Sequence, residues 1–354
     1  MIIMLLAFPF VIGGQWLSVA YNITYFILAA LGVQLLIGYC GQITLGHAAF
    51  VAVGAYCSAV LMIHVPWPDF MSKAGLVYPV TIVCAGFAAG FWSVLFGLPS
   101  ARVKGFYLIM TTMAAQFVTI NLVLTQYVSQ IGGRGQALNL PMDISLFGIS
   151  VYESSFIGGI EINTDTKLYY FSVILMAICL LAMGNLLRSK IGRAWVAIRD
   201  NDIAAETMGV NIIWYKLLAF FVAGFFAGIA GSFWIITTMV VSPEHFIWYY
   251  SLLWVGIILI GGVGSIQGLV FGSAFIVLVF KFLEMGNIFL TTFLMKSYPE
   301  YAWMTAKISF FKESAFGLAV IFFLIYEPNG LAYRYWQMKN YINLWPFSYT
   351  GKGH

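Results

Sequence analysis

The feature that most constrains this chain is its scarcity of charge. Only 8% of its 354 residues are Asp, Glu, Lys or Arg, whereas 62% are hydrophobic. About 25% of the residues of a soluble globular protein are charged. Apolar surface on this scale is stable only when lipid surrounds it. The composition therefore predicts an all-α, polytopic transmembrane helix bundle, in which each helix satisfies its own backbone polar groups inside the bilayer.

Ten apolar stretches divide the chain, and each predicts one membrane-spanning helix. They cover residues 2–12, 21–37, 46–63, 76–98, 105–123, 168–187, 214–236, 249–260, 266–283 and 314–326. The first, the eighth and the last are clearly shorter than the ~20 residues that a perpendicular helix needs. The apolar N-terminus lacks the basic region and the cleavage site of a signal peptide, so we expect a short first span there.

The distribution of charge predicts the orientation of these spans. With the N-terminus inside, residues 99–104, 188–213, 264–265 and 327–354 face the cytoplasm. Together with Lys216, these segments hold ten of the 17 basic residues but only four of the 13 acidic ones. The basic residues are Arg102, Lys104, Arg188, Lys190, Arg193, Arg199, Lys216, Arg334, Lys339 and Lys352. Because short loops rich in Lys and Arg stay inside, both termini are predicted to be cytoplasmic.

We predict a single membrane-spanning domain over residues 1–354. Its principal cytoplasmic loop covers residues 188–213, and its cytoplasmic tail covers residues 327–354. Two long loops, 124–167 and 284–313, lie outside and have room for short helices or strands that face a partner. Glycines four residues apart predict positions where helix backbones approach closely. These are Gly86 and Gly90, Gly224 and Gly228, and the trio Gly264, Gly268 and Gly272.

The sequence carries no motif of an enzyme. A phosphate-binding loop would read G-x-x-x-x-G-K-[ST], and the only Gly-Lys pair, Gly351-Lys352, is followed by another glycine. The four cysteines lack metal-ligand spacing, and the four histidines lie far apart. The net charge of +4 is too small to indicate nucleic-acid binding. We expect no catalytic residue, no metal and no cofactor on this chain, so a separate chain would hydrolyse any ATP that drives it.

Ionisable side chains are nearly absent from the predicted spans. Only His47, Lys281 and Glu284 come close, and all three lie near predicted span ends. We expect Lys281 to reach the outer interface or to pair with Glu284. Because ion-coupled transporters place ionisable groups inside their spans, this pattern disfavours a secondary transporter.

Glycine and polar residues interrupt the otherwise apolar segment of residues 38–56. A broken helix exposes backbone polar groups, which are tolerated at membrane depth only where protein or a water cavity satisfies them. Transporters use such segments to bind polar solutes. An ordinary turn between two helices is the alternative interpretation. The candidate substrate-pathway residues are Gly41, Gln42, Thr44, Gly46 and His47.

The cytoplasmic loop of residues 188–216 predicts two short helical pieces. Asp200 or Asn201 is suited to cap the second piece, and Gly209 is suited to end it in a left-handed conformation. Such a helix fits the groove of a cytosolic partner, although an amphipathic helix at the membrane interface remains an alternative. The candidate coupling residues are Arg193, Arg199, Asp202, Ala204, Ala205, Glu206 and Gly209.

Four motifs resemble the membrane subunits of branched-chain amino acid ABC importers of the Liv type, closest to the LivM-like branch. They are GQITLGHAAFVAVGAY (41–56), LPSARVKGFYLIMTTMAAQ (98–116), IGRAWVAIRDNDIAAETMGVN (191–211) and GIILIGGVGSIQGLVFGSAF (256–275). They cover most of residues 38–275, and their order and spacing make the resemblance specific. One departure is the IGG of residues 131–133, where the family more often has TGG.

The resemblance implies a permease in a bacterial or archaeal cytoplasmic membrane. Its implied partners are a LivH-like second permease, two cytosolic ATPase subunits that bind ATP and Mg²⁺, and an extracytoplasmic binding protein. The coupling helix of such permeases resembles E-A-A-x-x-x-G, which Ala204, Ala205 and Gly209 match. Ile203 replaces the glutamate, and Asp202 or Glu206 is the nearest acidic substitute.

These patterns lead to the hypothesis of an ABC importer permease that works by alternating access. The cargo would be branched-chain or related amino acids, with urea, short amides or organic acids as the alternative. The alternative from a different class of transport protein is a secondary transporter or channel that acts alone. Such a protein would transport its solute without ATP. A membrane enzyme or scaffold would need a catalytic cluster or a large soluble module, and the sequence contains neither.

Overall fold

The computed structural model describes most of the chain, in ten stretches of residues. These are residue 9 and residues 13–103, 105–128, 137–141, 144–146, 148–152, 155–157, 160–297, 310–327 and 329–344. The chain forms two compact units, Met1–Val255 and Gly256–His354, with the boundary inside one helix. The single domain over residues 1–354 stays a prediction.

Helices build almost all of the first unit. They are α2 (Gly14–Val33), its π-helical continuation η1 (Gln34–Tyr39), α3 (His47–His64), α4 (Asp69–Lys73), α5 (Val77–Ser100), α6 (Phe106–Phe117), its π-helical continuation η2 (Val118–Val128), α8 (Thr164–Arg188), α9 (Lys190–Asp200), α10 (Asp202–Thr207), α11 (Ile212–Thr238), the 3₁₀ helix η3 (Pro243–Phe246) and the first part of α12 (Trp248–Gly261). The predominance of helix confirms the predicted fold class in its coarse form.

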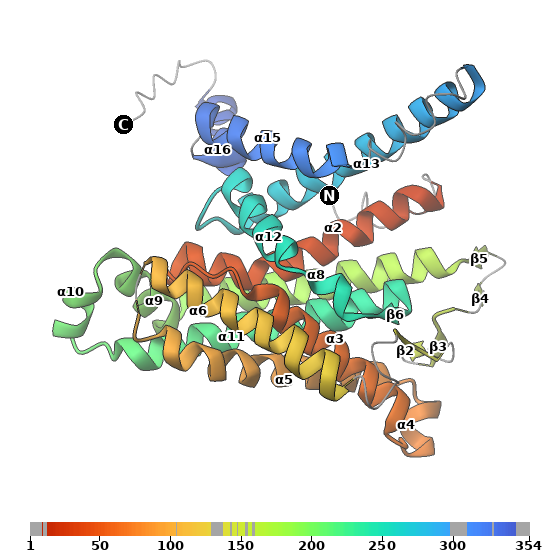
Figure 1. Ribbon diagram of the computed structural model, residues 1–354, viewed down its shortest axis with the longest axis horizontal. Coiled ribbons are helices and arrows are strands. Elements are labelled where there is room, and N and C mark those ends of the chain that lie inside the picture. The colour runs from red at the N-terminus through yellow and green to blue at the C-terminus, as the bar shows by residue number, and fades with distance from the viewer. Residues whose placement is uncertain are drawn as a thin grey trace. The chain divides into compact units, whose positions relative to one another are not determined.

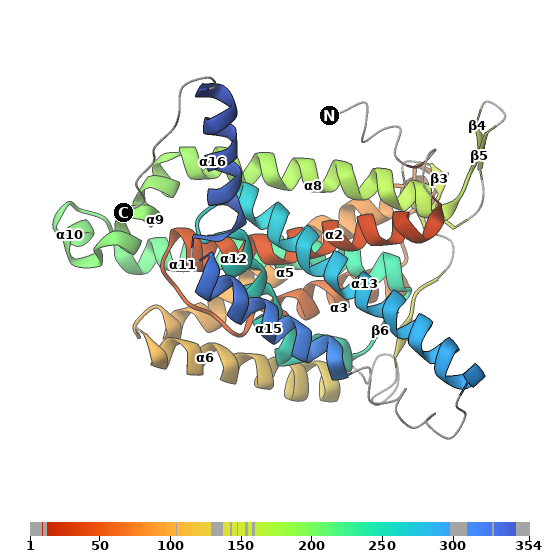
Figure 2. The same cartoon turned by 90° about the horizontal axis from the view of Figure 1, so that it is seen from above.

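Short antiparallel strand pairs interrupt the helices of the first unit. They are β1 (Leu138–Asn139) with β6 (Val240–Val241), β2 (Ser145–Leu146) with β3 (Ile149–Ser150), and β4 (Ser155–Ile157) with β5 (Ile160–Ile162). All but β6 lie in the predicted outer loop 124–167. Strands β2 to β5 lie at one end of the unit, and α10 lies at the opposite end (Figures 1 and 2). This arrangement agrees with the prediction that loops 124–167 and 188–213 face opposite sides.

Seven helical segments in the described part of the chain are long and apolar enough to cross a membrane. They are Gly14–Tyr39, His47–His64, Val77–Ser100, Thr164–Arg188, Ile212–Thr238, Pro243–Gly261 and Ile266–Gly286. The protein is therefore a multi-pass membrane protein. Two further predicted spans fall on shorter helices, α6 and α15 (Phe310–Tyr326), while the predicted span 2–12 lies outside the described residues apart from residue 9. The total of about ten spans and the placement of both termini inside stay predictions.

Helix α11 is the centre of the first unit, where it packs against α5, α3 and α2. Small residues allow this close approach: a side chain at Gly224 would meet Ala89 and Ser93 of α5, and one at Gly228 would meet Ala85. The predicted packing role of these two glycines is confirmed. Helices α3, α5 and α11 run side by side in both views (Figures 1 and 2).

The second unit contains the end of α12, α13 (Ile266–Ser297), α15 and α16 (Gly330–Leu344). Gly268 and Gly272 pack closely on the end of α12, as their spacing predicted, whereas Gly264 lies in a turn at φ 80°. Helix α13 runs well past the predicted span end at residue 283, so the loop predicted at 284–313 begins as helix. The predicted pair of Lys281 and Glu284 is present, at 3.4 Å between nitrogen and oxygen.

Candidate functional site

The predicted interruption after Gly38 is confirmed. Helix α2 continues as the π-helix η1 to Tyr39, the chain then leaves helical geometry, and α3 begins at His47. We call residues 40–46 the broken segment. Gly41 has φ 69°, a conformation that side chains of L-residues rarely adopt. A side chain there would also press against Arg199.

Hydrogen bonds inside the protein satisfy much of the broken segment's backbone. The N–H of Gln42 donates to the carbonyl of Leu36 at 2.7 Å. The N–H of Leu45 donates to Thr112 Oγ1 at 3.2 Å, and the N–H of Gly46 donates to Thr44 Oγ1 at 3.3 Å. Irregular backbone within a membrane bundle is stable when protein supplies such partners. The predicted residues Thr44 and Gly46 therefore lie buried and support the shape of this segment.

A buried polar chain continues from the start of α3, and sequence reasoning missed it. The N–H of Ala48 donates to Ser251 Oγ at 2.9 Å, and this hydroxyl donates to Gln116 Oε1 at 2.9 Å. The amide of Gln116 donates to the carbonyl of Phe246 at 3.3 Å. These contacts join α3, α6, η3 and the start of α12. The available signal was a glutamine and a serine inside otherwise apolar spans.

His47 is fully buried at the first turn of α3. Its ring lies edge-on to Phe50 and Trp254, each with ring centres 5.8 Å apart. The ring faces the backbone of Ala29, but neither ring nitrogen reaches hydrogen-bond geometry with a described residue. Gly32 leaves the space that the imidazole fills. These contacts place His47 in the packed interior of the first unit, directly after the broken segment.

The two predicted short helices of the cytoplasmic loop are confirmed as α9 and α10. Ser189 begins α9, because its Oγ accepts from the N–H of Ile191 at 3.2 Å. Of the two residues predicted to cap the next helix, Asn201 does so, with Oδ1 accepting from the N–H of Ala204 at 3.1 Å. Gly209 follows α10 at φ 86°, as predicted for its terminator.

Helix α9 is anchored, whereas α10 presents an apolar surface to the outside of the unit. Trp195 of α9 is fully buried, and its indole N–H donates to the carbonyl of Tyr215 in α11 at 2.8 Å. On α10 and directly after it, Ile203 is 70% exposed and Met208 is 86% exposed, while Ala205 is only 4% exposed. Ala205 therefore faces inward. The other predicted coupling residues Arg193, Ala204 and Glu206 are exposed.

Arg199 joins the two predicted sites, which are far apart in the sequence. Its Nη1 donates to the carbonyl of Gly38 at 2.7 Å. Its Nε and Nη2 both donate to Asp200 Oδ1, at 3.0 and 2.9 Å. The aliphatic part of the same side chain covers Gly41. Arg199, a candidate coupling residue of the cytoplasmic loop, thus directly contacts the end of η1 and the start of the broken segment.

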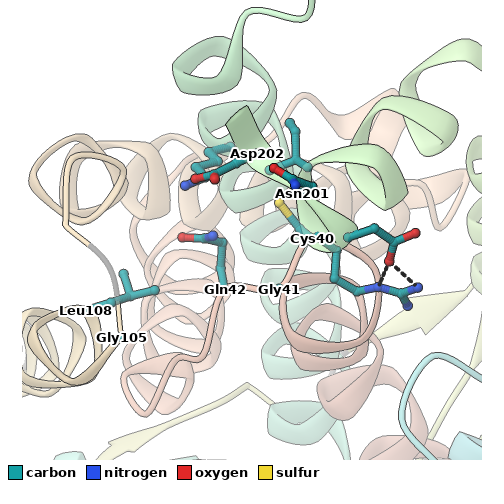
Figure 3. Close-up of a pocket in the computed structure, with 11 residues that line it drawn as sticks. Cys40, Gly41, Gln42, Gly105, Leu108, Asn201 and Asp202 are labelled. Atoms are coloured by element: carbon teal, nitrogen blue, oxygen red, sulfur yellow. Dashed lines mark hydrogen bonds and ion pairs between the residues drawn. The ribbon is translucent and has the colours of Figure 1, made fainter. Parts of the chain in front are cut away.

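A cavity of about 350 Å³ opens where the broken segment, the start of α6 and the α9–α10 junction meet (Figure 3). Its walls include Cys40, Gln42, Leu108, Ile198, Asp202 and Lys216. The carboxamide of Gln42 points across the cavity toward Asp202 (Figure 3). Burial raises the pKa of the Cys40 thiol to about 12, although nearby Lys216 opposes this shift.

Known proteins identify the family of this chain. Residues 15–325 match the family described as the permease component of the branched-chain amino acid transport system. Two relatives are the high-affinity branched-chain amino acid transport system permease proteins LivM of Salmonella typhimurium and Escherichia coli. Each is 25% identical over 343 residues, which cover 94% of this chain and 73% of the relative. No solved structure matches the chain.

The family match includes the broken segment, both cytoplasmic helices and every candidate membrane span except the first residue of the first one. It therefore applies to the site as well as to the spans around it. The chain belongs to the family of permease components of branched-chain amino acid transport systems, and within that family it is LivM-like.

Proposed function

We propose that this chain is the transmembrane permease subunit of an ATP-driven ABC importer for branched-chain or related amino acids. It would work in a cytoplasmic membrane with a LivH-like second permease, two cytosolic ATPase subunits and an extracytoplasmic binding protein. The chain itself would bind no cofactor, since ATP and Mg²⁺ would sit on the ATPase subunits. The observation that carries this proposal is the direct contact of Arg199 with the end of η1, inside a family match over residues 15–325.

The contact supports a route for mechanical coupling. The ATPase subunits would dock against α10, where Ile203 and Met208 offer exposed apolar side chains. Trp195 anchors α9 to α11, so a push on α10 would reach the membrane-spanning helices. Arg199 would carry the same movement to η1 and the broken segment. Alternating access would follow if the ATP-bound and ATP-free states of the ATPases favour different arrangements of these helices.

The test reconstitutes this chain with its partner permease, ATPases and binding protein in vesicles. We expect uptake of radiolabelled leucine, isoleucine or valine that requires both ATP and the binding protein. The matched control contains ATPase subunits in which the catalytic glutamate is replaced. Equal uptake in that control, or uptake by this chain alone without ATP, would overturn the proposal in favour of a secondary transporter or channel.

The same assay resolves the cargo. Unlabelled urea, short amides and organic acids compete with the labelled amino acid in parallel reactions. We expect strong competition only from amino acids with short aliphatic side chains. Stronger competition from urea or an amide would keep the importer but reassign its cargo.

A further inference from the structure

We infer that the cavity between the broken segment, α6 and the α9–α10 junction binds a small zwitterion with a short aliphatic side chain. This inference rests on the proposed function, because an amino acid would be the cargo of this chemical class. It goes further by assigning the cargo a particular site and particular contacts. The cavity of about 350 Å³ falls within the range of about 300–1,000 Å³ that is typical of small-molecule sites.

Three stretches that are distant in the sequence build the cavity, residues 40–42, 105–108 and 198–216. Gln42 comes from the broken segment, Leu108 from α6, Ile198 and Asp202 from the two cytoplasmic helices, and Lys216 from α11. All of them belong to the first unit. A cavity assembled from so many elements changes shape when any of them moves. It is therefore placed to gain or lose a ligand as α9 and α10 move.

The charges of the lining favour a zwitterion over a simple anion or cation. Two basic side chains, Arg199 and Lys216, and two acidic ones, Asp200 and Asp202, surround the cavity. Arg199 and Asp200 pair with each other at 2.9 Å, and both side chains are well exposed. Lys216 is only 2% exposed. A lining with both signs and no net charge complements a ligand that carries both an ammonium and a carboxylate group.

Gln42 supplies the observation that points to a ligand. Its side chain is 7% exposed, and its carboxamide is aimed across the cavity toward Asp202 (Figure 3). Its Oε1 is buried and accepts no hydrogen bond from any described residue. Buried polar atoms in native proteins nearly always have a partner. Between this acceptor and the Asp202 carboxylate, an ammonium group would find both a hydrogen bond and an opposite charge.

The remaining walls suit the other end of such a ligand. Leu108 and Ile198 contribute apolar side chains, and Cys40 behaves as a small apolar residue when it is protonated. Small-molecule sites typically combine apolar walls with a few polar groups that orient the ligand. The two ends of the lining therefore match the head group and the side chain of an aliphatic amino acid.

The experiment measures equilibrium binding of radiolabelled L-leucine to the assembled permease and ATPase complex in nanodiscs, without ATP and without the binding protein. We expect saturable binding. Gln42→Leu and Asp202→Asn should each weaken it by about tenfold or more, since the first removes a hydrogen-bond acceptor for the ammonium group and the second removes the opposite charge. The matched controls are Gln15→Leu, an exposed amide at the start of α2, and Lys190→Gln, an exposed charge on α9 outside the cavity. Both controls should bind leucine as the unmodified complex does.

Two analogues test the zwitterion in the unmodified complex, so this arm does not depend on how a variant folds. 3-Methylbutylamine lacks the carboxylate, and 4-methylpentanoate lacks the ammonium group. Each should compete for the site about tenfold or more weakly than leucine, because one charged contact is missing. Equal competition by either analogue, absence of saturable binding, or unchanged affinity in Gln42→Leu would overturn the inference.

Different experimental results would overturn this inference and the proposed function. A complex that imports leucine with ATP but binds none in this cavity would leave the importer intact and remove the site. A complex that imports no amino acid under any condition would instead remove the proposed function, whatever the cavity binds.

Discussion

The broken segment and helix α10 both interrupt the run of long helices, but their surroundings are opposite. Most side chains of the broken segment are buried, although Ile43 is 44% exposed, and its backbone donates to Leu36, Thr44 and Thr112 of the same chain. Helix α10 and the residue directly after it expose two large apolar side chains, Ile203 and Met208. The first region is complementary to its own chain, whereas the second presents a surface that another molecule can cover. Arg199 is the point where they meet.

The accessibility of thiols in the two regions gives the largest expected contrast. Burial raises the pKa of Cys40 to about 12, so near pH 8 it stays protonated and unreactive. A cysteine introduced by Thr207→Cys on exposed α10 should be alkylated about a thousandfold faster, since only the thiolate reacts. The rate at Cys40 should rise about tenfold per pH unit up to that pKa. Mass spectrometry of maleimide-treated protein, followed by peptide mapping, measures both rates.

Equal rates at pH 8 would show that the Cys40 thiol is open to solvent. That result would remove the contrast between a buried thiol in the broken segment and an exposed one on α10. The variant in which Cys40 is replaced by serine is the control for assignment of the labelled peptide.

Filling the space at Gly46 should disrupt the broken segment most strongly. A side chain there would meet the backbone of Thr112 in α6, which cannot move aside as a flexible side chain would. Gly46→Val should lower stability by about 1–3 kcal/mol or more, in the range of overpacked interiors. Thermal unfolding followed by size-exclusion chromatography measures the loss. The control is Gly184→Val in α8, where an added side-chain carbon meets nothing within 4 Å.

Removing the link between the two regions should separate ATP hydrolysis from transport. Arg199→Gln loses the hydrogen bond to the carbonyl of Gly38 while leaving Ile203 and Met208 in place. Coupling free energies between sites are typically 1–3 kcal/mol, so we expect uptake per ATP hydrolysed to fall by about tenfold. Parallel assays of uptake and phosphate release measure the ratio. An unchanged ratio, with Lys190→Gln as the charge-matched control, would mean that Arg199 only stabilises the fold.

The local features of both regions could be predicted from the sequence, because short-range chemistry determines them. A run of apolar residues makes a span, Asn201 is a good helix cap, and Gly209 tolerates a left-handed conformation. The interruption near Gly41 was predictable for the same reason. The end of α13 was not, because its helix continues into a stretch with more polar and charged residues, where hydropathy no longer marks the boundary.

Contacts between distant residues were beyond such reasoning. Arg199 and Gly38 are separated by 161 positions, and nothing in either local sequence indicates the partner. The inward orientation of Ala205 also depends on how α10 packs, which the motif alone does not determine. The cavity is the clearest case, since its walls come from segments that only the packed bundle brings together.

Charge placed on the exposed apolar surface should have the smallest effect of these changes and the most selective one. Ile203→Asp and Met208→Asp alter side chains that are already mostly exposed, so the unfolding temperature of the isolated chain should stay nearly unchanged. If the ATPase subunits dock there, each substitution should cost about 1–2 kcal/mol of binding, because a charge would be buried in an apolar contact. Co-purification in mild detergent, titrated with ATPase subunits, measures the affinity.

The matched control is Phe70→Asp, which changes an exposed apolar residue of α4. If Ile203→Asp and Met208→Asp lower the affinity for the ATPase subunits no more than the control does, α10 is not the docking surface. Another molecule would then have to cover these two side chains.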